Sequence, residues 1–315
     1  MSSKFLGTTR FSLFEPDSPS WRLSRRDGRD DADRYRQLLY SPERMKSRME
    51  IFFDQSLPQL DLGSAGYEYL HVVSYSHELP QKYLAHLENA AARYSWLRLD
   101  CRTPTDRRGK SMEKWALEEF SPGDIYAEFR LDDDDLLAPT YFETVSNYLT
   151  NEHVGFYVSL GLGIQAFYAD ERFLEPRLEH RPKIAIGLAR VCRVDSPQKT
   201  TGPKRVAHTQ IDRHVPVIID SQKVQYLHSI HLSQDSGVDK PEGDLGNRIR
   251  NYLNQPEPES DLISSLFPRA NFGAMSELDQ FRLLLGAHTN LDTLRSSLLK
   301  LRRRVVLPAT IRKKR

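Results

Sequence analysis

The sequence predicts an α/β protein with a mixed, mostly parallel sheet and helices on both of its faces. Apolar segments rich in β-forming residues alternate with segments of helical periodicity, which is the order expected of βαβ units. Each expected strand runs into a polar loop, and parallel strands would bring those loops to one edge of the sheet. With 315 residues, 39% of them hydrophobic, the chain can bury a sizeable core.

The expected strands and helices follow in order along the chain. Strands are predicted at residues 4–14, 67–75, 96–101, from 125 into an acidic turn, 154–168 and 183–194. Helices are predicted at residues 41–57, 80–94, 111–120, 141–149 and 281–301. Ser41 and Pro42 form the expected start of a helix, and we expect the apolar stripe of Met45, Met49 and Phe52 to pack in the core.

Residues 125–137, IYAEFRLDDDDLL, carry the most functional information. Four adjacent carboxylates at residues 132–135 repel one another, so we expect them on a solvated turn or around a cation that offsets the repulsion. The apolar strand before them would deliver them to the carboxyl edge of the sheet, where open α/β sheets bind ligands. Mg²⁺ or Mn²⁺ usually binds through one or two carboxylates plus substrate phosphates. The alternative is a solvated charge run or a helix N-terminus.

The string LDDDD at residues 131–135 resembles the acidic DXD motif of GT-A glycosyltransferases, and its context resembles the putative rhamnosyltransferase family within that fold. Supporting segments are KFLGTTRFSLF, WRLSRR, FFDQSLPQL, VGFYVSLGLG and the expected strands around Trp96 and Ile125. The resemblance implies a GT-A catalytic domain over residues 1–238. Composition then predicts a linker and a helical C-terminal extension with a basic tail over residues 239–315.

The resemblance also implies an activity: transfer of a sugar from a nucleotide-diphosphate donor to a hydroxyl of a glycan or lipid-linked glycan. Rhamnose as the sugar follows from the family name alone. Asp134 would bind the Mn²⁺ or Mg²⁺ ion, and Asp132 would contact the metal or the ribose. A late histidine often completes the cation shell in such enzymes, which makes His231 the candidate and His228 the second choice.

Candidate residues for the nucleotide and its diphosphate come from several expected loops. The resemblance places Thr8 and Arg10 beside the nucleotide. It also makes Asp132 and Asp133 of the acidic motif candidates for contact with the nucleotide. Parallel strand order brings the loop after residue 100 to the same edge, where cations would complement a diphosphate. That loop supplies Asp100, Arg102 and Lys110. The alternative for these positions is ordinary strand and loop chemistry.

A transferase that inverts the anomeric centre needs a carboxylate to deprotonate the acceptor hydroxyl. In many such GT-A enzymes this acid follows the segment that corresponds to residues 154–168, so the resemblance makes Asp170 or Glu171 the candidate. The alternative is an acidic pair that is simply solvated in a turn.

Composition limits the other classes of function. The formal net charge of +2 gives no global field that points to nucleic acid. No apolar run approaches the length of a membrane span, and the first residues lack a signal pattern, so we expect a cytoplasmic protein. The basic tail LRRRVVLPATIRKKR could contact an anionic membrane at its inner face. A nucleotidyltransferase and a non-catalytic nucleotide- or glycan-binding protein remain the alternatives.

Overall fold

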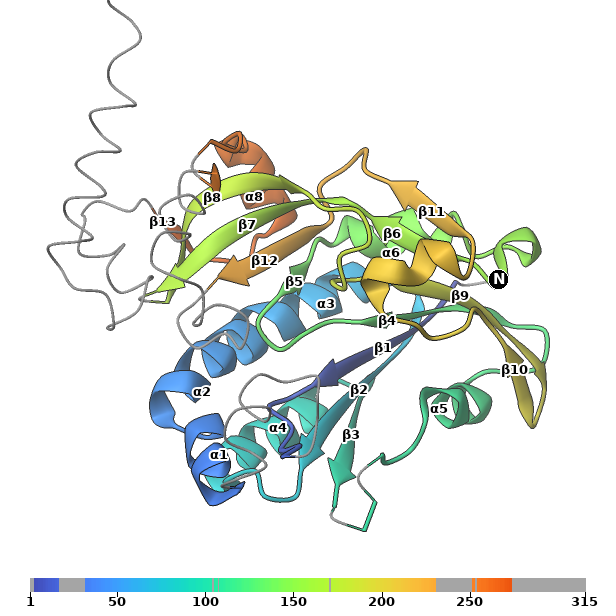
Figure 1. Ribbon diagram of the computed structural model, residues 1–315, viewed down its shortest axis with the longest axis horizontal. Coiled ribbons are helices and arrows are strands. Elements are labelled where there is room, and N and C mark those ends of the chain that lie inside the picture. Colours follow the sequence, from blue (N-terminus) through green and yellow to red (C-terminus); the bar gives the residue numbers. More distant parts are fainter. Residues whose placement is uncertain are drawn as a thin grey trace, which may run out of the picture.

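The computed structural model describes most of the chain up to residue 273. The described residues are 3–16, 32–103, 105–106, 108–169, 171–230, 251–252 and 254–273. Within them the chain alternates between strands and helices through residue 146 and is dominated by strands after that (Figure 1).

The main sheet has the strand order β11-β6-β9-β4-β1-β2-β3, with β10 paired to β9. Its strands are β1 (Lys4–Arg10), β2 (Glu68–Ser76), β3 (Leu97–Arg102), β4 (Ile125–Arg130), β6 (Tyr157–Leu160), β9 (Ala189–Ser196), β10 (Lys199–Thr201) and β11 (Val217–Asp220). β1 to β4 run parallel to one another, whereas β9 is antiparallel to both β4 and β6. The mixed, mostly parallel sheet predicted from the sequence is confirmed.

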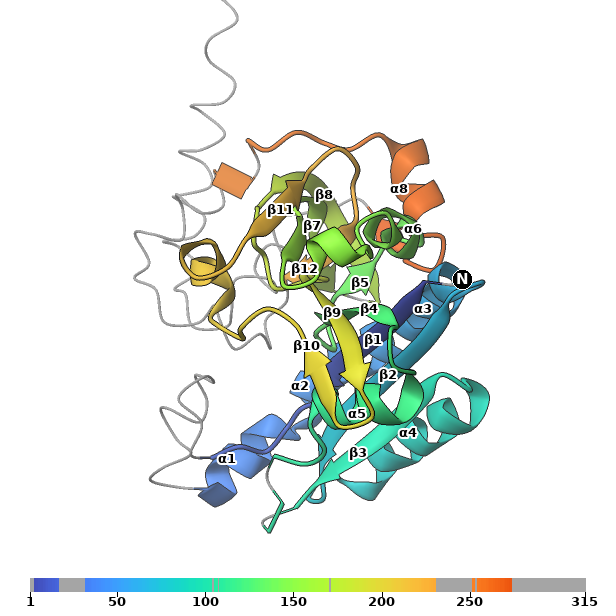
Figure 2. The ribbon, with the colours of Figure 1, turned by 90° about the vertical axis from the view of Figure 1, so that its right-hand side faces the viewer.

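A second sheet has the order β13-β8-β7-β12-β5. Its strands are β5 (Leu136–Leu137), β7 (Leu162–Ala169), β8 (Arg172–His180), β12 (Tyr226–Ile230) and β13 (Phe272–Gly273). In both ribbon views it lies above β1, β2 and β3 of the main sheet (Figures 1 and 2). The acidic residues 132–135 connect β4 of the main sheet to β5 of the second, so they lie where the two sheets meet.

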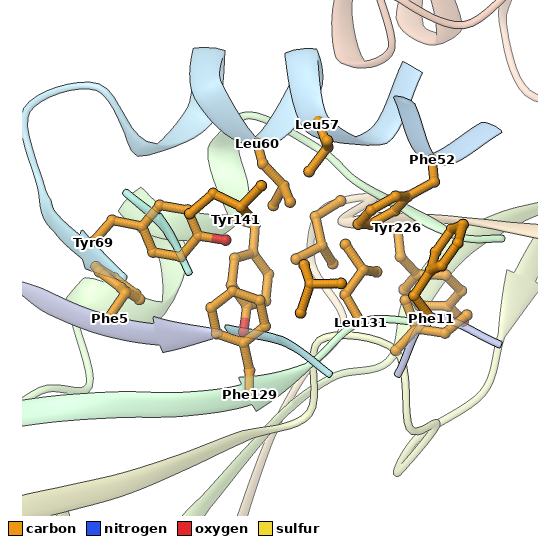
Figure 3. Close-up of a cluster of buried hydrophobic side chains, with 14 of the residues drawn as sticks. Phe5, Phe11, Phe52, Leu57, Leu60, Tyr69, Phe129, Leu131, Tyr141 and Tyr226 are labelled. Atoms are coloured by element: carbon orange, nitrogen blue, oxygen red, sulfur yellow. The ribbon is translucent and has the colours of Figure 1, made fainter. Parts of the chain in front are cut away.

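Helices cover the main sheet unequally. They are α1 (Ala32–Leu39), α2 (Pro42–Met49), α3 (Leu57–Ser64), α4 (Gln81–Arg93), α5 (Met112–Glu119), α6 (Thr140–Ser146) and α8 (Ser260–Leu266), with a π-helical segment Glu50–Ser56 and 3₁₀ turns Asn151–His153 and His208–Arg213. Adjacent residues of a strand face opposite sides, so Phe5 and Leu6 of β1 enter different cores. The larger core, around Phe5 and Phe129, packs against α1 to α4 and α6, and Leu6 packs against α5. Figure 3 shows the part of the larger core that lies against Phe52, Leu57 and Leu60.

Several boundaries differ from the sequence prediction. β1 ends at Arg10 rather than at residue 14, and the strand expected at 183–194 is β9, which begins at Ala189. The helix expected to end near Pro58 instead continues through the π-helical segment into α3 and ends at Ser64. Pro58 stands where the π-helical segment passes into α3, directly after Leu57, whose N–H donates to the Phe52 carbonyl. The apolar stretch 154–168, expected as one strand, is divided between β6 and β7 in different sheets. The break is at Gly161, where a Cβ would lie 2.5 Å from Ser221 Oγ.

Residues 260–273 pack against the second sheet. Ile263 of α8 and Phe267, which directly follows that helix, share a core with Ile164 and Phe173, and β13 pairs with β8. The predicted boundary at residue 238 stays a prediction, and the helix expected at 281–301 and the basic tail lie outside the described residues. Within the described part, no helix has the length and apolar character needed to cross a membrane.

Candidate active site

β1 and β2 fix the point at which the acidic turn begins. Leu131 N–H donates to the Thr8 carbonyl at 3.0 Å, and the Thr9 hydroxyl donates to the Leu131 carbonyl at 2.8 Å. His71 Nε2 is 2.8 Å from Thr9 Oγ1, and its Nδ1 is 2.6 Å from the Tyr69 hydroxyl. Because the Thr9 hydroxyl donates its proton to the Leu131 carbonyl, Nε2–H of His71 donates to Thr9 Oγ1. The Tyr69 hydroxyl donates to Nδ1 of His71. Complete burial lowers the pKa of His71 to about 3, which keeps the ring neutral in this relay.

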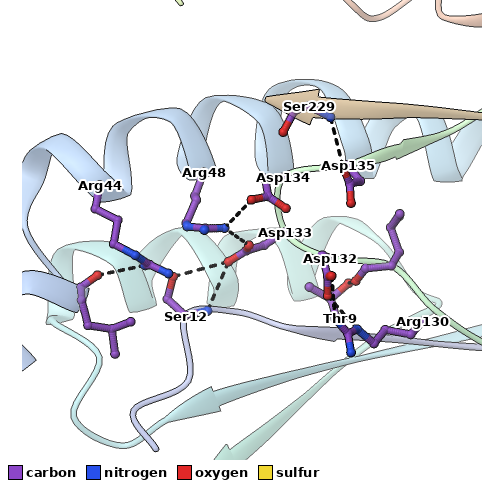
Figure 4. Close-up of polar contacts among 12 residues, drawn as sticks. Thr9, Ser12, Arg44, Arg48, Arg130, Asp132, Asp133, Asp134, Asp135 and Ser229 are labelled. Atoms are coloured by element: carbon purple, nitrogen blue, oxygen red, sulfur yellow. Dashed lines mark hydrogen bonds and ion pairs between the residues drawn. The ribbon is translucent and has the colours of Figure 1, made fainter. Parts of the chain in front are cut away.

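The acidic turn itself is buried, which corrects the expectation of a solvated turn. Asp133, Asp134 and Asp135 are 4%, 7% and 4% exposed. Arg48 of α2, also buried, forms ion pairs with Asp133 and with Asp134, the latter at 2.9 Å (Figure 4). The backbone N–H of Ser12 donates to Asp133 Oδ2 at 3.2 Å. The repulsion among the acids is thus offset by an arginine of the chain.

Two carboxyl groups of the turn, those of Asp133 and Asp135, hold protons more tightly than ordinary aspartates. Burial raises the pKa of Asp133 to about 6, although the charge of Arg48 opposes the shift. Burial and the charge of Asp134 raise the pKa of Asp135 well above its usual value, and Asp135 Oδ1 accepts from the Ser229 N–H of β12 at 3.1 Å. β12 of the second sheet is therefore joined to the turn through an aspartate that is not paired with Arg48.

Three arginines are the last residues of parallel strands of the main sheet: Arg10 of β1, Arg102 of β3 and Arg130 of β4. Burial, followed by the charge of Arg130, lowers the pKa of Arg10, and Arg102 contributes in the same direction. Arg130 holds Asp132 through two hydrogen bonds of 2.7 and 2.6 Å. The guanidinium groups of Arg102 and Arg130 are thus close enough to Arg10 to repel its positive charge.

Arg102 contacts the predicted residue Asp100. Its Nη2 is 2.9 Å from Asp100 Oδ2 and 2.9 Å from Ser74 Oγ. Its Nε and Nη1 are buried without a hydrogen-bonding partner among the described residues. Buried donors without partners are costly, so this guanidinium can gain from a further acceptor.

The structure does not bring every predicted residue to this edge. Lys110 lies over the Trp115 ring at 3.6 Å and pairs with Glu118, so it points toward α5. Glu171, at the turn between β7 and β8, has a 68% exposed side chain and lies 3.8 Å from Lys46. Asp170 and His231 lie outside the described residues. The edge therefore brings together Arg10, Asp100, Arg102 and residues 132–134, with the backbone of Thr8 beneath them.

Sequence reasoning missed the residues that hold the turn from α2. Arg44 and Arg48 are four residues apart, so they share one helix face. Arg44 donates to Ser12 Oγ at 3.1 Å, next to the contacts of Arg48 with the turn. Two arginines on one face of a helix that also carries methionines are a sequence signal for a buried acidic partner.

The donor chemistry of the turn fits a hard cation that is completed by substrate. Carboxylate oxygens are the ligands that Mg²⁺ and Mn²⁺ prefer, and one or two usually suffice when phosphates supply the rest. Asp132 and Asp134 offer carboxylates on one short turn. Within the described ranges, no group of three His, Cys, Asp or Glu side chains is arranged to hold a metal alone. A cation held by Asp132 and Asp134 would therefore take its remaining ligands from phosphate oxygens and water.

Comparisons with solved structures give distant neighbours. The inositol-1-phosphate CTP transferase from T. maritima is 8% identical, with 84% of this chain and 96% of that chain covered and a TM-score of 0.32. A putative glucose-1-phosphate thymidylyltransferase from Bacillus anthracis, in complex with a sucrose, is 8% identical, with 82% and 98% covered and a TM-score of 0.30. Residues 1–349 of S. aureus TarS are 12% identical, with 84% and 69% covered and a TM-score of 0.26.

At such scores the neighbours carry no argument about chemistry. No curated protein matches the chain. The profile of one protein family, described as "Putative rhamnosyl transferase", matches residues 4–243, which include the acidic turn, the arginine-bearing strand ends and all of β12. This match covers most of the chain, and it supports a glycosyltransferase-like transferase. The chain belongs to the rhamnosyl transferase family.

Proposed function

We propose that this protein transfers a sugar, rhamnose by its family, from a nucleotide diphosphate to a hydroxyl of a glycan or a lipid-linked glycan. The observation that carries the proposal is the joining of a buried acidic turn to three arginines at one edge of the sheet. The arginines suit a diphosphate, and the acids suit the cation and ribose that accompany it. The metal, the donor and the acceptor are all parts of the proposal.

The arginines favour a polyanionic ligand for a physical reason. Like charges that oppose one another in a partly buried place are relieved when an anion joins them, and guanidinium groups match phosphate oxygens in a bidentate way. Burial and the charge of Arg130 lower the pKa of the partly buried Arg10, against the opposing charges of Asp132 and Glu15, and Arg102 has buried donors without partners among the described residues. A diphosphate at this edge would relieve both conditions.

Catalysis would then be mainly electrostatic. As the bond from the anomeric carbon to the diphosphate breaks, negative charge collects on the departing oxygen, and fixed positive groups stabilise it. Arg10 and Arg102 would bind the phosphates, and Asp132 and Asp134 would hold a divalent cation between the turn and the diphosphate. Such a cation supplies charge stabilisation without a proton. The Arg48 contact would keep Asp134 in position for this.

Nucleotide binding by arginine variants tests the proposal. Titration calorimetry with dTDP, UDP and GDP, each with Mn²⁺, should find one nucleotide that binds. Arg10→Gln and Arg102→Gln should each weaken it by about 10- to 100-fold, the worth of one charge-assisted hydrogen bond. Arg98→Gln is the matched control, because Arg98 is exposed on β3 and donates to the backbone carbonyls of Ser95 and Leu97. Equal affinity in all three variants would overturn the arginine site.

A further inference from the structure

A histidine–glutamate pair lies in the second sheet beside the acidic turn. His228 of β12 has its Nδ1 3.2 Å from Oε2 of Glu179 on β8, so the pair spans the intervening strand β7. Gly163 of β7 is the register partner of Glu179. A Cβ at Gly163 would lie 2.2 Å from the Tyr226 ring, so the glycine is what lets that ring lie beside the pair.

The hydrogen bond fixes the proton on the imidazole. A carboxylate only accepts, so Nδ1 of His228 carries the proton, and in the neutral ring Nε2 holds a lone pair. The side chain is 22% exposed, and Nε2 has no hydrogen-bonding partner in the described part of the chain. Glu179 is held in turn by Arg181 at 3.5 Å. A base oriented by a third group through its other nitrogen is the arrangement of a general base.

The pair is placed next to the proposed donor site by backbone contacts. Leu227 of β12 pairs with Leu136 of β5, and the N–H of Ser229 donates to Asp135 of the acidic turn (Figure 4). His228 stands between these two contacts. Leu227 enters the core of the second sheet, so His228 lies on the opposite face, away from that core. The imidazole is therefore close to the turn, and its side chain keeps 22% exposure to solvent.

We infer that His228 is the general base that takes the proton of the acceptor hydroxyl, and that Glu179 positions its ring. The inference rests on the proposed function and names a residue for it. As the acceptor oxygen bonds to the anomeric carbon, its proton passes to Nε2 of His228. The bond from that carbon to the diphosphate oxygen breaks, its electron pair leaves with the diphosphate, and the proton is later lost to water. This displacement inverts the anomeric centre.

The surroundings of His228 set the pH at which it can accept a proton. Burial lowers the pKa of His228, but the hydrogen bond that His228 donates to Glu179 and the charges of Asp135 and Glu179 more than offset this, and Arg181 opposes them. The net shift is upward, so the base becomes competent above the usual histidine range. Tyr226 is the other titratable group at Glu179, and its pKa is raised, first by burial.

Hydrolysis of the donor with water as acceptor tests the inference. dTDP-rhamnose and a panel of UDP- and GDP-sugars serve as probes, with release of the nucleotide diphosphate as the readout and thermal shift as the measure of donor binding. His228→Gln should lower kcat by about 10²- to 10⁴-fold and leave the donor-induced shift unchanged. Imidazole should restore turnover to His228→Ala, which a purely structural role would not allow.

Two further variants separate positioning from chemistry. Glu179→Gln should lower kcat less and move the acidic limb of the pH profile to lower pH, because the histidine loses the carboxylate that raises its pKa. His180→Gln is the matched control, since His180 ends the same strand, is exposed and contacts Ser221. It should behave as wild type.

The outcomes distinguish this inference from the proposed function. Wild-type turnover in His228→Gln, or a collapse of kcat in Asp170→Asn or Glu171→Gln with His228→Gln unaffected, would overturn the assignment of the base and leave the transferase standing. A wild-type protein that neither binds nor hydrolyses any nucleotide sugar would overturn the proposed function, and this inference with it.

Discussion

Two buried charge clusters lie on or beside β4, and they differ in how their charges are balanced. Glu128, within the strand, is one buried carboxylate that accepts from Arg190 at 2.6 Å and from Arg205, which also reaches Glu113 at 2.7 Å. The acidic turn at the strand's end reverses the ratio, with Arg48 shared between Asp133 and Asp134. The first cluster is saturated with arginine, whereas the second can accept more positive charge.

This difference has a functional meaning. A saturated ion-pair cluster gains nothing from a ligand, so we interpret the Glu128 cluster as a structural connection between β4, β9 and the segment that carries Arg205. Two carboxylates that share one arginine at the carboxyl edge of a sheet are suited to a cation and its nucleotide. The same residue types thus serve packing in one place and, in our proposal, a site in the other.

Removing the central arginine of each cluster should give the largest contrast. Arg48→Met leaves Asp133 and Asp134 buried without their shared cation, which should cost about 3–5 kcal/mol in the free energy of unfolding. Arg190→Met should cost less, because Glu128 keeps Arg205. Urea unfolding of both variants measures the difference. Equal losses would mean that Arg48 is no more essential to its cluster than Arg190 is to the other.

Neutralising one acid in each cluster should separate binding from stability. Asp134→Asn should lower Mn²⁺-dependent nucleotide-sugar affinity by about 100-fold, since it removes a charged ligand worth about 3 kcal/mol. Because Asp134 is buried, asparagine is used to preserve its volume. Glu128→Gln should change stability and leave affinity unchanged. Loss of affinity in Glu128→Gln, or none in Asp134→Asn, would contradict the division into a structural cluster and a site.

The fold was largely predictable from the sequence, because its signals are local. Strand segments and helical stripes gave β2 to β4, α4 and α5 within a residue or two, whereas β1 ends four residues before its predicted end. The position of the acids at the end of β4 followed from the apolar run before them. The burial of the acidic turn was not predictable from that run. The burial of the turn depends on Arg48, which is 85 residues from Asp133 in the sequence, and on Thr9, which is 122 residues from Leu131. No local spacing encodes these contacts.

The acidic turn is held by the neutral relay from His71 through Thr9 as well as by the charged side chain of Arg48. The stability contributed by the neutral relay depends on pH in a way that can be measured. The pKa of His71 is about 3 in the folded protein, against 6.5 for an ordinary histidine. Between these values the unfolded chain binds the extra proton, so stability is present above pH 6.5 and falls as the pH decreases toward 3. The expected loss from this group is about 1.4 kcal/mol per pH unit.

Unfolding free energies at several pH values from 7 to 4 measure this contribution, with His71→Gln as the reference. The variant loses the relay to Thr9 and is less stable throughout, so the comparison uses slopes rather than absolute values. The wild type should lose stability more steeply on acidification than the variant. Parallel slopes would mean that His71 takes up its proton in the folded state and does not form the neutral relay.

The most direct test of the site is a thermal-shift panel of nucleotide diphosphates and nucleotide sugars, run with Mn²⁺, with Mg²⁺ and with a chelator. A ligand that binds only the folded protein raises its melting temperature. We expect one nucleotide to stabilise the wild type only when metal is present, and the shift to disappear in Asp134→Asn but not in Glu128→Gln. Stabilisation that is unchanged by the chelator would contradict the metal site, and no shift with any nucleotide would contradict the donor site.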